Sequence, residues 1–254
     1  MGLSIAESEE LGLAWIIREA EINLYRSLHP HDIFDLTVWL VDWHRVHGRR
    51  CFELNLKDSG ELVADGVQEV VSLDLKSMRP VATPDYIIES IRIENPRVIP
   101  HQKFPKFQLR PESAFAIQRN VEWRDLDSQE HVNNAHYVAF AEEAAVKALA
   151  ALGWSPAHFK NQSLVLADKR VHIQYQSSAA WGERLDVVTH LVELKPAGGI
   201  WYTQIERASD REPVARCLIE WSLANRTSAE EQTLPDNLSK ILKDKIAIAE
   251  GIAS

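Results

Sequence analysis

The chain has 254 residues, of which 45% are hydrophobic and 26% are charged, as is usual for a globular protein. The net charge of −9 argues against general nucleic-acid binding, because that function requires a basic face. The sequence contains no apolar run of about 18 residues, so we expect no membrane span, and its acidic start without a basic signal segment predicts a cytoplasmic location.

The first predicted element is a β-strand, Leu13–Leu24, in which the apolar residues Ala20, Ile22 and Leu24 alternate with polar ones. An amphipathic helix over Ser8–Leu28 is the competing interpretation, because a few apolar positions also fall near helical spacing. We favour the strand because a similar segment later in the chain has to adopt the same structure.

An internal repeat predicts the domain organisation. The segment Ala20–Val38 aligns with Val171–Thr189, and Ile22 is matched to Ile173, so the offset is 173 − 22 = 151. A repeat of this length is typical of two copies of one domain and not of a solenoid. We expect an N-terminal domain over residues 1–100, a linker over 101–112, a second domain over 113–226 and a helical tail over 227–254.

The second copy is predicted to be an α+β domain. Alternating or β-branched patterns predict its strands, and one long Ala-rich helix lies between the first strand and the others. This helix is expected to begin after Asn133 or Asn134, which are both good N-cap residues, and to end at Gly153. The predicted strands are Phe115–Glu122, Leu164–Tyr175, Leu185–Val192, Ile200–Arg207 and Val214–Leu223.

Polar side chains are concentrated immediately before this helix. A helix N-terminus offers unpaired backbone N–H groups and a positive dipole end, which can stabilise an oxyanion next to a carboxylate that activates water. An Asx-rich turn that only caps the helix is the alternative, but the number of polar residues favours a reaction site. The residues are Asp125, Asp127, Gln129, His131, Asn133 and Asn134.

The segment that contains these residues resembles the hotdog-fold thioesterases. Its pattern, from Trp123 to Tyr137, reads W-x-D-x-D-x-x-x-H-V-N-N-x-x-Y. It is most similar to the acyl-ACP thioesterases of plants and bacteria, and 4-hydroxybenzoyl-CoA thioesterase is a more distant relative. The resemblance implies tandem hotdog folds, in each of which an antiparallel sheet wraps around a central helix.

The resemblance also implies roles for individual residues. Asp127 would orient or activate water, or attack the thioester directly, and His131 would assist proton transfer. Gln129 stands where the plant enzymes have asparagine, so an amide is retained but is one methylene longer. The predicted catalytic residues are Asp127, His131, Gln129 and Asn133, and the predicted substrate-binding residues are Asn134, Tyr137, Lys169 and Arg170.

The chain departs from the plant family at one further position. That family uses a glutamate from the strand after the helix, whereas Gln174, Gln176 or Ser178 occupies the region here and the next acid is Glu183. We therefore keep two classes of function. The first is hydrolysis of a fatty acyl thioester of acyl carrier protein or, alternatively, of CoA, with no cofactor and no metal. The second is a non-catalytic acyl-binding or scaffold protein.

The first copy is expected to be incomplete. Too few residues precede Leu13–Leu24 for a first strand and a central helix, so the N-terminal hotdog would lack both. An apolar sheet face left uncovered in this way favours association, and we predict a homo-oligomer. At the other end of the chain, the spacing of apolar residues predicts an amphipathic helix over Leu238–Ile252 that packs back on the sheets.

Overall fold

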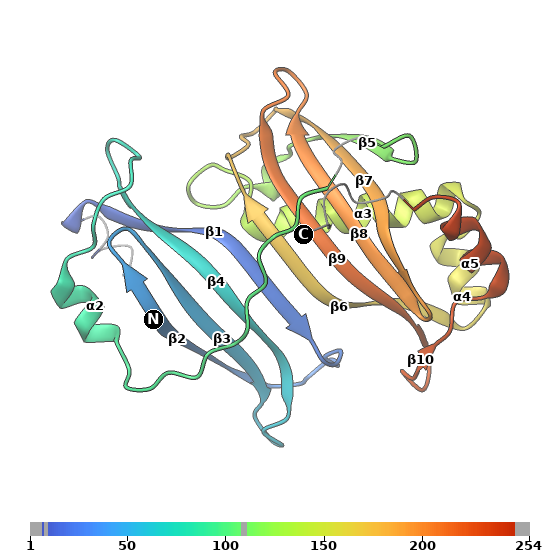
Figure 1. Ribbon diagram of the computed structural model, residues 1–254, viewed down its shortest axis with the longest axis horizontal. Coiled ribbons are helices and arrows are strands. Elements are labelled where there is room, and N and C mark those ends of the chain that lie inside the picture. The colour runs from blue at the N-terminus through green and yellow to red at the C-terminus, as the bar shows by residue number, and fades with distance from the viewer. Residues whose placement is uncertain (1–6, 8–9, 108–110, 247–254) are drawn as a thin grey trace, which may run out of the picture. The chain divides into compact units, whose positions relative to one another are not determined.

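The computed structural model describes residues 7, 10–107 and 111–246. These residues form two compact units, unit 1 within residues 1–103 and unit 2 within residues 104–254 (Figure 1). Each unit is built on an antiparallel β-sheet, and unit 2 adds a long helix. In the part of the chain that the structure describes, no helix is both long and apolar enough to cross a bilayer.

Unit 1 is a sheet with the strand order β2-β3-β4-β1. Its first strand, β1, covers Leu13–Leu24, so the strand prediction is confirmed and the helical alternative is wrong. A short helix, α2 (Asp85–Ile91), follows the last strand. The other strands are β2 (Phe34–His44), β3 (His47–Leu56) and β4 (Leu62–Asp74).

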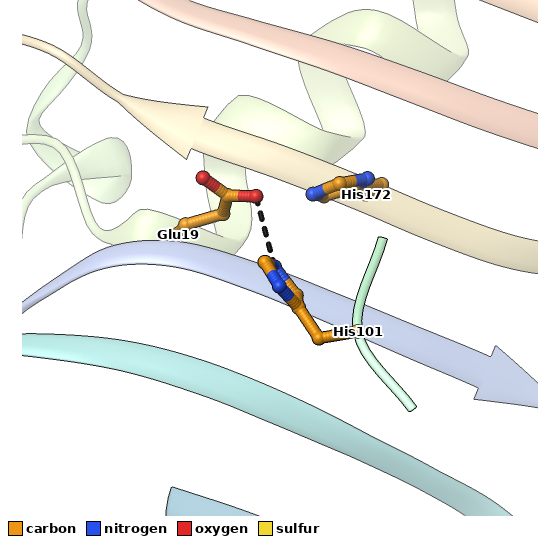
Figure 2. A group of neighbouring side chains, drawn as sticks. All are labelled: Glu19, His101 and His172. Carbon is orange, nitrogen blue, oxygen red and sulfur yellow. Dashed lines mark hydrogen bonds and ion pairs between the residues drawn. The ribbon is translucent and has the colours of Figure 1, made fainter. Parts of the chain in front are cut away.

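The last residues of unit 1 cross one face of its sheet. The indole N–H of Trp39 on β2 donates to the backbone oxygen of Arg97 at 2.6 Å, and Ile99 is buried against Trp39. Two residues later, Nε2 of His101 lies 3.0 Å from a carboxylate oxygen of Glu19 on β1, and Figure 2 shows the two side chains pointing toward each other. Apolar burial and polar contacts therefore both fix this segment to the sheet.

Unit 2 is a sheet with the strand order β6-β9-β8-β7-β5, and β10 pairs with β9. The long helix α3 lies across one face of this sheet (Figure 1). The elements are β5 (Phe115–Asn120), the short 3-10 helix η1 (Trp123–Asp125), α3 (Asn134–Ala151), α4 (Pro156–Asn161), β6 (Leu164–Tyr175), β7 (Arg184–Lys195), β8 (Gly198–Arg207), β9 (Pro213–Asn225), β10 (Glu231–Gln232) and α5 (Asp236–Lys243).

The helix α3 begins and ends as its sequence predicts. The side-chain oxygen of Asn133 accepts a hydrogen bond from the backbone N–H of Ala135 at 3.0 Å, which caps the first turn. At the other end, Gly153 has a φ of +90°, a conformation that glycine adopts at little cost. The buried face of α3 is rich in alanine, and these small side chains let the sheet approach the helix closely: Ala141, Ala144, Ala145 and Ala148.

A second group of buried side chains lies at the end of unit 2 where α4 and α5 pack. Phe159 of α4 and Leu238 and Leu242 of α5 belong to one hydrophobic cluster with Trp201 and Trp221 of the sheet. The prediction that the C-terminal helix packs back on the sheet is therefore confirmed. Its predicted length is wrong, because α5 ends at Lys243. The rest of the predicted helix from residue 247 lies outside the described residues.

The internal repeat is present in the strands of the two units. The strands β1 and β6 begin at Leu13 and Leu164, so the offset is 164 − 13 = 151. The same offset relates both ends of β3 to β8 and of β4 to β9. The irregularity between Ile17 and Glu19 in β1 also has its counterpart between Asp168 and Arg170 in β6. The two units are therefore copies of one fold.

The two copies differ in the elements that precede their first shared strand. In unit 2, β5 and α3 precede β6, whereas the described residues of unit 1 contain no counterparts of β5 and α3. The consequence appears on β2, where Phe34 is 46% and Leu36 is 60% exposed. Their counterparts on β7, Leu185 and Val187, are 0% exposed in unit 2, where α3 packs against β7. Unit 1 therefore presents an apolar face that α3 covers in unit 2.

Candidate functional site

Three of the four predicted catalytic residues lie in one tight turn, which we call the site turn, Asp127–His131, and the fourth, Asn133, is the N-cap of α3. A carboxylate oxygen of Asp127 accepts a hydrogen bond from the backbone N–H of Gln129 at 2.9 Å. The backbone N–H of Asp127 donates to the oxygen of His131 at 2.8 Å and closes the turn. Glu130 has a φ of +62°, which such a tight reversal requires. The side chain of Asp127 therefore forms an Asx-type turn that holds Asp127 and His131 together.

The site turn is attached to a second segment that follows β6. His131 and Ala180 form an antiparallel bridge, and the backbone N–H of Val132 donates to the oxygen of Ala179 at 2.9 Å. The backbone N–H of Ala179 donates to the hydroxyl oxygen of Tyr137 on α3 at 3.0 Å. Tyr137 is 2% exposed, so its hydroxyl anchors this segment to the helix.

The N-terminus of α3 follows the site turn directly. Asn133 provides the side-chain cap, and the backbone oxygen of Asn134 accepts a hydrogen bond from the hydroxyl of Tyr175 on β6 at 3.2 Å. Burial raises the pKa of Tyr137 to about 12, so this phenol is neutral at physiological pH and serves here as a hydrogen-bonding group. The helix thus directs its positive dipole end toward the segment that carries Asp127 and His131.

A buried carboxylate fixes the chain just before the site turn. Asp125 is 0% exposed, and its oxygens accept from Arg119 on β5 at 3.0 Å and from the backbone N–H of Glu122 at 2.8 Å. Nδ1 of His136 on α3 lies 3.4 Å from the same carboxylate. The backbone oxygen of Asp125 also accepts from the N–H of Asn133. Asp125 therefore ties β5, the site turn and the start of α3 together.

The geometry suits a reaction that uses water. The side chains of Asp127 and Gln129 are exposed, and His131 is half-buried. An accessible carboxylate can accept a proton from water, an imidazole in the same turn can carry a proton to a leaving group, and the helix end favours negative charge that develops nearby. These three features make the site turn capable of general acid–base chemistry on an ester or thioester.

Two of the predicted substrate-binding residues lie away from the site turn. Lys169 and Arg170 are in the middle of β6, where Lys169 occupies the bulge and its ammonium is 3.8 Å from a carboxylate oxygen of Glu231. Tyr175 is the β6 residue that contacts the start of α3, and Lys169 is six positions earlier, about 20 Å along an extended strand. The structure therefore does not bring Lys169 and Arg170 together with Asp127.

The structure distinguishes the three residues considered for the missing glutamate. The amide oxygen of Gln174 accepts a hydrogen bond from Arg216 at 2.8 Å. Gln176 is exposed, and its backbone N–H donates to Val214. Ser178 directly precedes Ala179 and Ala180, whose backbones bind the site turn. Of the three residues, it is therefore the nearest along the chain to that point of contact.

Sequence reasoning missed the ion pairs that hold this region. Arg119 pairs with Asp125 and with Glu143 of α3, at 3.0 Å in each case, and its guanidinium lies 4.0 Å from the centre of the Phe140 ring. Alternation along β5 was a usable signal, because it places Arg119 on the half-buried face of the strand, with Phe115 and Ile117.

Comparison with known proteins places this geometry in context. The sequence profile described as the thioesterase-like superfamily matches residues 1–91 and 121–242. The palmitoyl-acyl carrier protein thioesterase of Cuphea hookeriana, a chloroplast protein, is 22% identical in an alignment of 221 positions that covers 84% of this chain and 49% of that protein. The chain therefore spans about half the length of the curated relatives it matches.

Solved structures show the same architecture. The 12:0-ACP thioesterase from Umbellularia californica superposes with a TM-score of 0.69 at 20% identity, over 87% of this chain and 77% of that one. An acyl-ACP thioesterase from Bacteroides thetaiotaomicron superposes with a TM-score of 0.65 at 17% identity, over 87% of this chain and 82% of that one. At these identities the likeness establishes the fold, and it confirms the predicted α+β tandem hotdog.

Proposed function

Because the chain belongs to the thioesterase-like superfamily, we propose that it hydrolyses a fatty acyl thioester of acyl carrier protein to the free fatty acid and the carrier thiol. The observation that carries the proposal is the site turn, in which an exposed Asp127 and a half-buried His131 are held at the N-terminus of α3. The relatives from Cuphea are named as thioesterases or hydrolases of acyl carrier protein substrates, and these names support the same class of substrate for this chain.

We propose the following sequence of steps. Asp127 accepts a proton from a water molecule, and the water oxygen attacks the carbonyl carbon of the thioester. Negative charge then develops on the carbonyl oxygen, where the positive end of α3 stabilises it. The carbon–sulfur bond breaks, the fatty acid is formed, and His131 supplies a proton to the departing thiolate. Gln129 orients the carbonyl or the water through its amide.

The other polar residues support the site turn in this proposal. Asn133 caps α3 and so fixes the direction of the helix end, and Asn134 and Tyr137 hold β6 and the segment after it against the helix. Direct attack by the Asp127 carboxylate is a distinct mechanism, in which an acyl anhydride forms first. A single turnover in water labelled with oxygen-18 tests the anhydride route. If water attacks the Asp127 carbonyl carbon of the anhydride, the label enters the Asp127 carboxylate and the fatty acid carries an Asp127 oxygen, whereas direct attack by water places the label only in the fatty acid.

A thiol-release assay tests the proposal. Acyl-ACP and acyl-CoA substrates with the same series of acyl chains are offered at equal concentration, and the released thiol is measured. We expect turnover of the acyl-ACP series with kcat/KM above that of the matched acyl-CoA series. Turnover of acyl-CoA alone favours the CoA thioesterase alternative, and absence of turnover with every substrate contradicts the proposal.

One observation favours a second candidate function, acyl binding without hydrolysis. The family glutamate has no carboxylate counterpart at Gln174, Gln176 or Ser178. In that case the chain would bind a fluorescent fatty acid or a non-hydrolysable acyl thioether but release no thiol. The thiol-release assay and a binding titration, run on the same preparation, therefore distinguish the two functions.

We also propose that the chain forms a homo-oligomer through unit 1. The support is the apolar face of β2, where Leu36 is 60% exposed while its repeat counterpart Val187 is 0% exposed. Large exposed apolar patches mark association surfaces. Light scattering should find a dimer or larger assembly that Leu36→Asp dissociates, whereas Met78→Asp, at a side chain 56% exposed in a turn, should not. A wild-type chain that stays monomeric at high concentration contradicts this.

A further inference from the structure

The segment bonded to the site turn is itself a tight turn, Ser178–Glu183, which we call the bracing turn. One carboxylate oxygen of Glu183 accepts from the backbone N–H of Ala180 at 2.9 Å, and the N–H of Glu183 donates back to the oxygen of Ala180 at 3.2 Å. Ala180 is the residue that forms the antiparallel bridge with His131. The conformation of Ala180 and the position of His131 are therefore coupled through one backbone pair.

Arg207, at the end of β8, holds the bracing turn at both ends. Its Nε lies 2.9 Å from the second carboxylate oxygen of Glu183, and one of its terminal nitrogens donates to the backbone oxygen of Ser178 at 3.1 Å. The other terminal nitrogen is 3.2 Å from a carboxylate oxygen of Asp210. Both oxygens of Glu183 are thus engaged, so this carboxylate acts as a brace and is not a free base.

We propose that the Glu183–Arg207 ion pair positions His131 and balances the charge beside the site turn. The role of His131 in proton transfer rests on the proposed function. The contacts that link Arg207, Glu183 and Ala180 to the backbone of His131 do not depend on it. The carboxylate of Glu183 acts through the backbone, because it holds Ala180, which is bridged to His131. Glu183 and Arg207 are positioning residues in this account, and neither contacts the reacting atoms.

The electrostatic part of the proposal is supported at Tyr137. Burial is the largest cause of the raised pKa of this phenol, and the charges of Glu183 and Asp127 raise it while that of Arg207 lowers it. The charges of the Glu183–Arg207 pair and of Asp127 in the site turn therefore both act on the hydroxyl of Tyr137. The other charged or titratable groups around this region are Asp125, Glu130, Arg119, His136, Glu143, Tyr175, Arg184 and Asp210.

The repeat provides an internal control. Asp32 of unit 1 is the counterpart of Glu183, and its carboxylate accepts from the backbone N–H of His29 at 2.8 Å, three residues earlier, as Glu183 does from Ala180. Asp32 is also paired with an arginine, Arg26, at 3.5 Å. The described residues of unit 1 contain no counterpart of the site turn. An acid that caps this turn and pairs with an arginine is therefore common to both copies, and among the described residues only the copy in unit 2 is bridged to a site turn.

The test is an NMR titration of the His131 ring in the full-length chain, with the signal assigned by its loss in His131→Gln. Glu183→Gln removes one of the two carboxylates that pair with Arg207, so the region beside the site turn gains net positive charge and the midpoint should fall by about 0.5 pH, equivalent to roughly 0.7 kcal/mol. Arg207→Gln leaves Glu183 unbalanced, so the midpoint should rise by a similar amount. The double variant should return close to the wild-type midpoint, and Asp32→Asn should not change it.

Opposite shifts that cancel in the double variant are a result that loss of structure alone does not produce. Shifts in the same direction, no shift, or a shift in only one single variant overturns the proposal. Arg207→Lys retains the positive charge, so its midpoint should equal that of the wild type. This variant replaces Arg207→Gln in the test if Arg207→Gln is too unstable to titrate. The measurement needs no substrate. A wild-type chain without thioesterase activity therefore contradicts the proposed function and leaves the brace to be judged by its own titration.

Discussion

The pair of carboxyl groups formed by Glu142 on α3 and Asp168 on β6 should make the stability of unit 2 depend on pH. The two side chains are half-buried and hydrogen-bonded to each other. Burial, followed by the hydrogen bond to Asp168 and the charge of Asp168, raises the pKa of Glu142 to about 8. The pair therefore shares a proton at neutral pH. Glu142→Gln replaces the proton donor by an amide N–H, which donates a hydrogen bond at any pH.

The magnitude follows from the difference between the ordinary pKa of 4.5 and the folded-state pKa of about 8. Because the folded chain binds this proton more tightly than the unfolded chain, the stabilisation is complete below pH 4.5 and is lost as the pH rises through about 8. At about 1.4 kcal/mol for each factor of ten, the full difference corresponds to roughly 5 kcal/mol. Water reaches the half-buried pair, so we expect on the order of 2 kcal/mol.

The assay is urea unfolding followed by circular dichroism at pH 5, 7 and 9. Glu142→Gln should match the wild type at pH 5 and be more stable by about 2 kcal/mol at pH 9, which corresponds to roughly 4–8 °C in Tm. Glu143→Gln is the matched control, because hydrogen bonding to Lys147 lowers the pKa of that adjacent carboxyl and its neutralisation should destabilise slightly. An equal effect of Glu142→Gln at pH 5 and pH 9 would refute the reasoning.

Three further results are expected. Asp125→Asn keeps the shape of a 0% exposed side chain but removes the charge that pairs with Arg119. The free energy of unfolding in urea should therefore fall by about 3 kcal/mol. A decrease below about 1 kcal/mol contradicts the role of Asp125 in holding β5, the site turn and α3 together. His190 makes no hydrogen bond to any described residue, and burial lowers its pKa from 6.5 to about 4, so wild-type stability should fall as the pH drops from 6.5 toward 4. His190→Leu should flatten that slope, as followed by thermal unfolding at several pH values, and an unchanged slope counts against it. Trp123 and Trp181 are 79% and 71% exposed, on segments that are hydrogen-bonded to each other beside the site turn. If these rings contact the carrier protein, Trp181→Ser should raise the KM for acyl-ACP several-fold with little change in kcat. An unchanged KM would show that this surface does not take part in substrate docking.

Much of the fold could be predicted because its signals are local. The residue pattern predicted the strand Leu164–Tyr175, the repeat carried that assignment to Leu13–Leu24, where apolar and polar residues also alternate, and both ends of β6 and β1 are correct. The helix α3 was bounded by Asn133 and Gly153, which act through their own backbone and side-chain geometry. The tail helix was predicted too long, because apolar spacing alone does not show where packing against the sheet stops.

The candidate site was predictable only in part, for a physical reason. Asp127, Gln129 and His131 lie within one turn, so sequence proximity is enough to bring them together. The contacts that hold this turn come from residues far along the chain, such as Arg207, which no local pattern connects to His131. Lys169 was chosen for its charge alone, and its distance from the turn depends on the length and direction of β6.

The most direct test of the central claim is single-turnover hydrolysis of a long-chain acyl-ACP by Asp127→Asn, compared with Glu130→Gln in the same turn. Both substitutions remove one exposed carboxylate from the site turn, and circular dichroism verifies that both variants fold. We predict that Asp127→Asn loses about a hundredfold or more in rate, as expected for loss of a general base, while Glu130→Gln stays within about twofold of the wild type. Wild-type hydrolysis by a correctly folded Asp127→Asn chain contradicts the account.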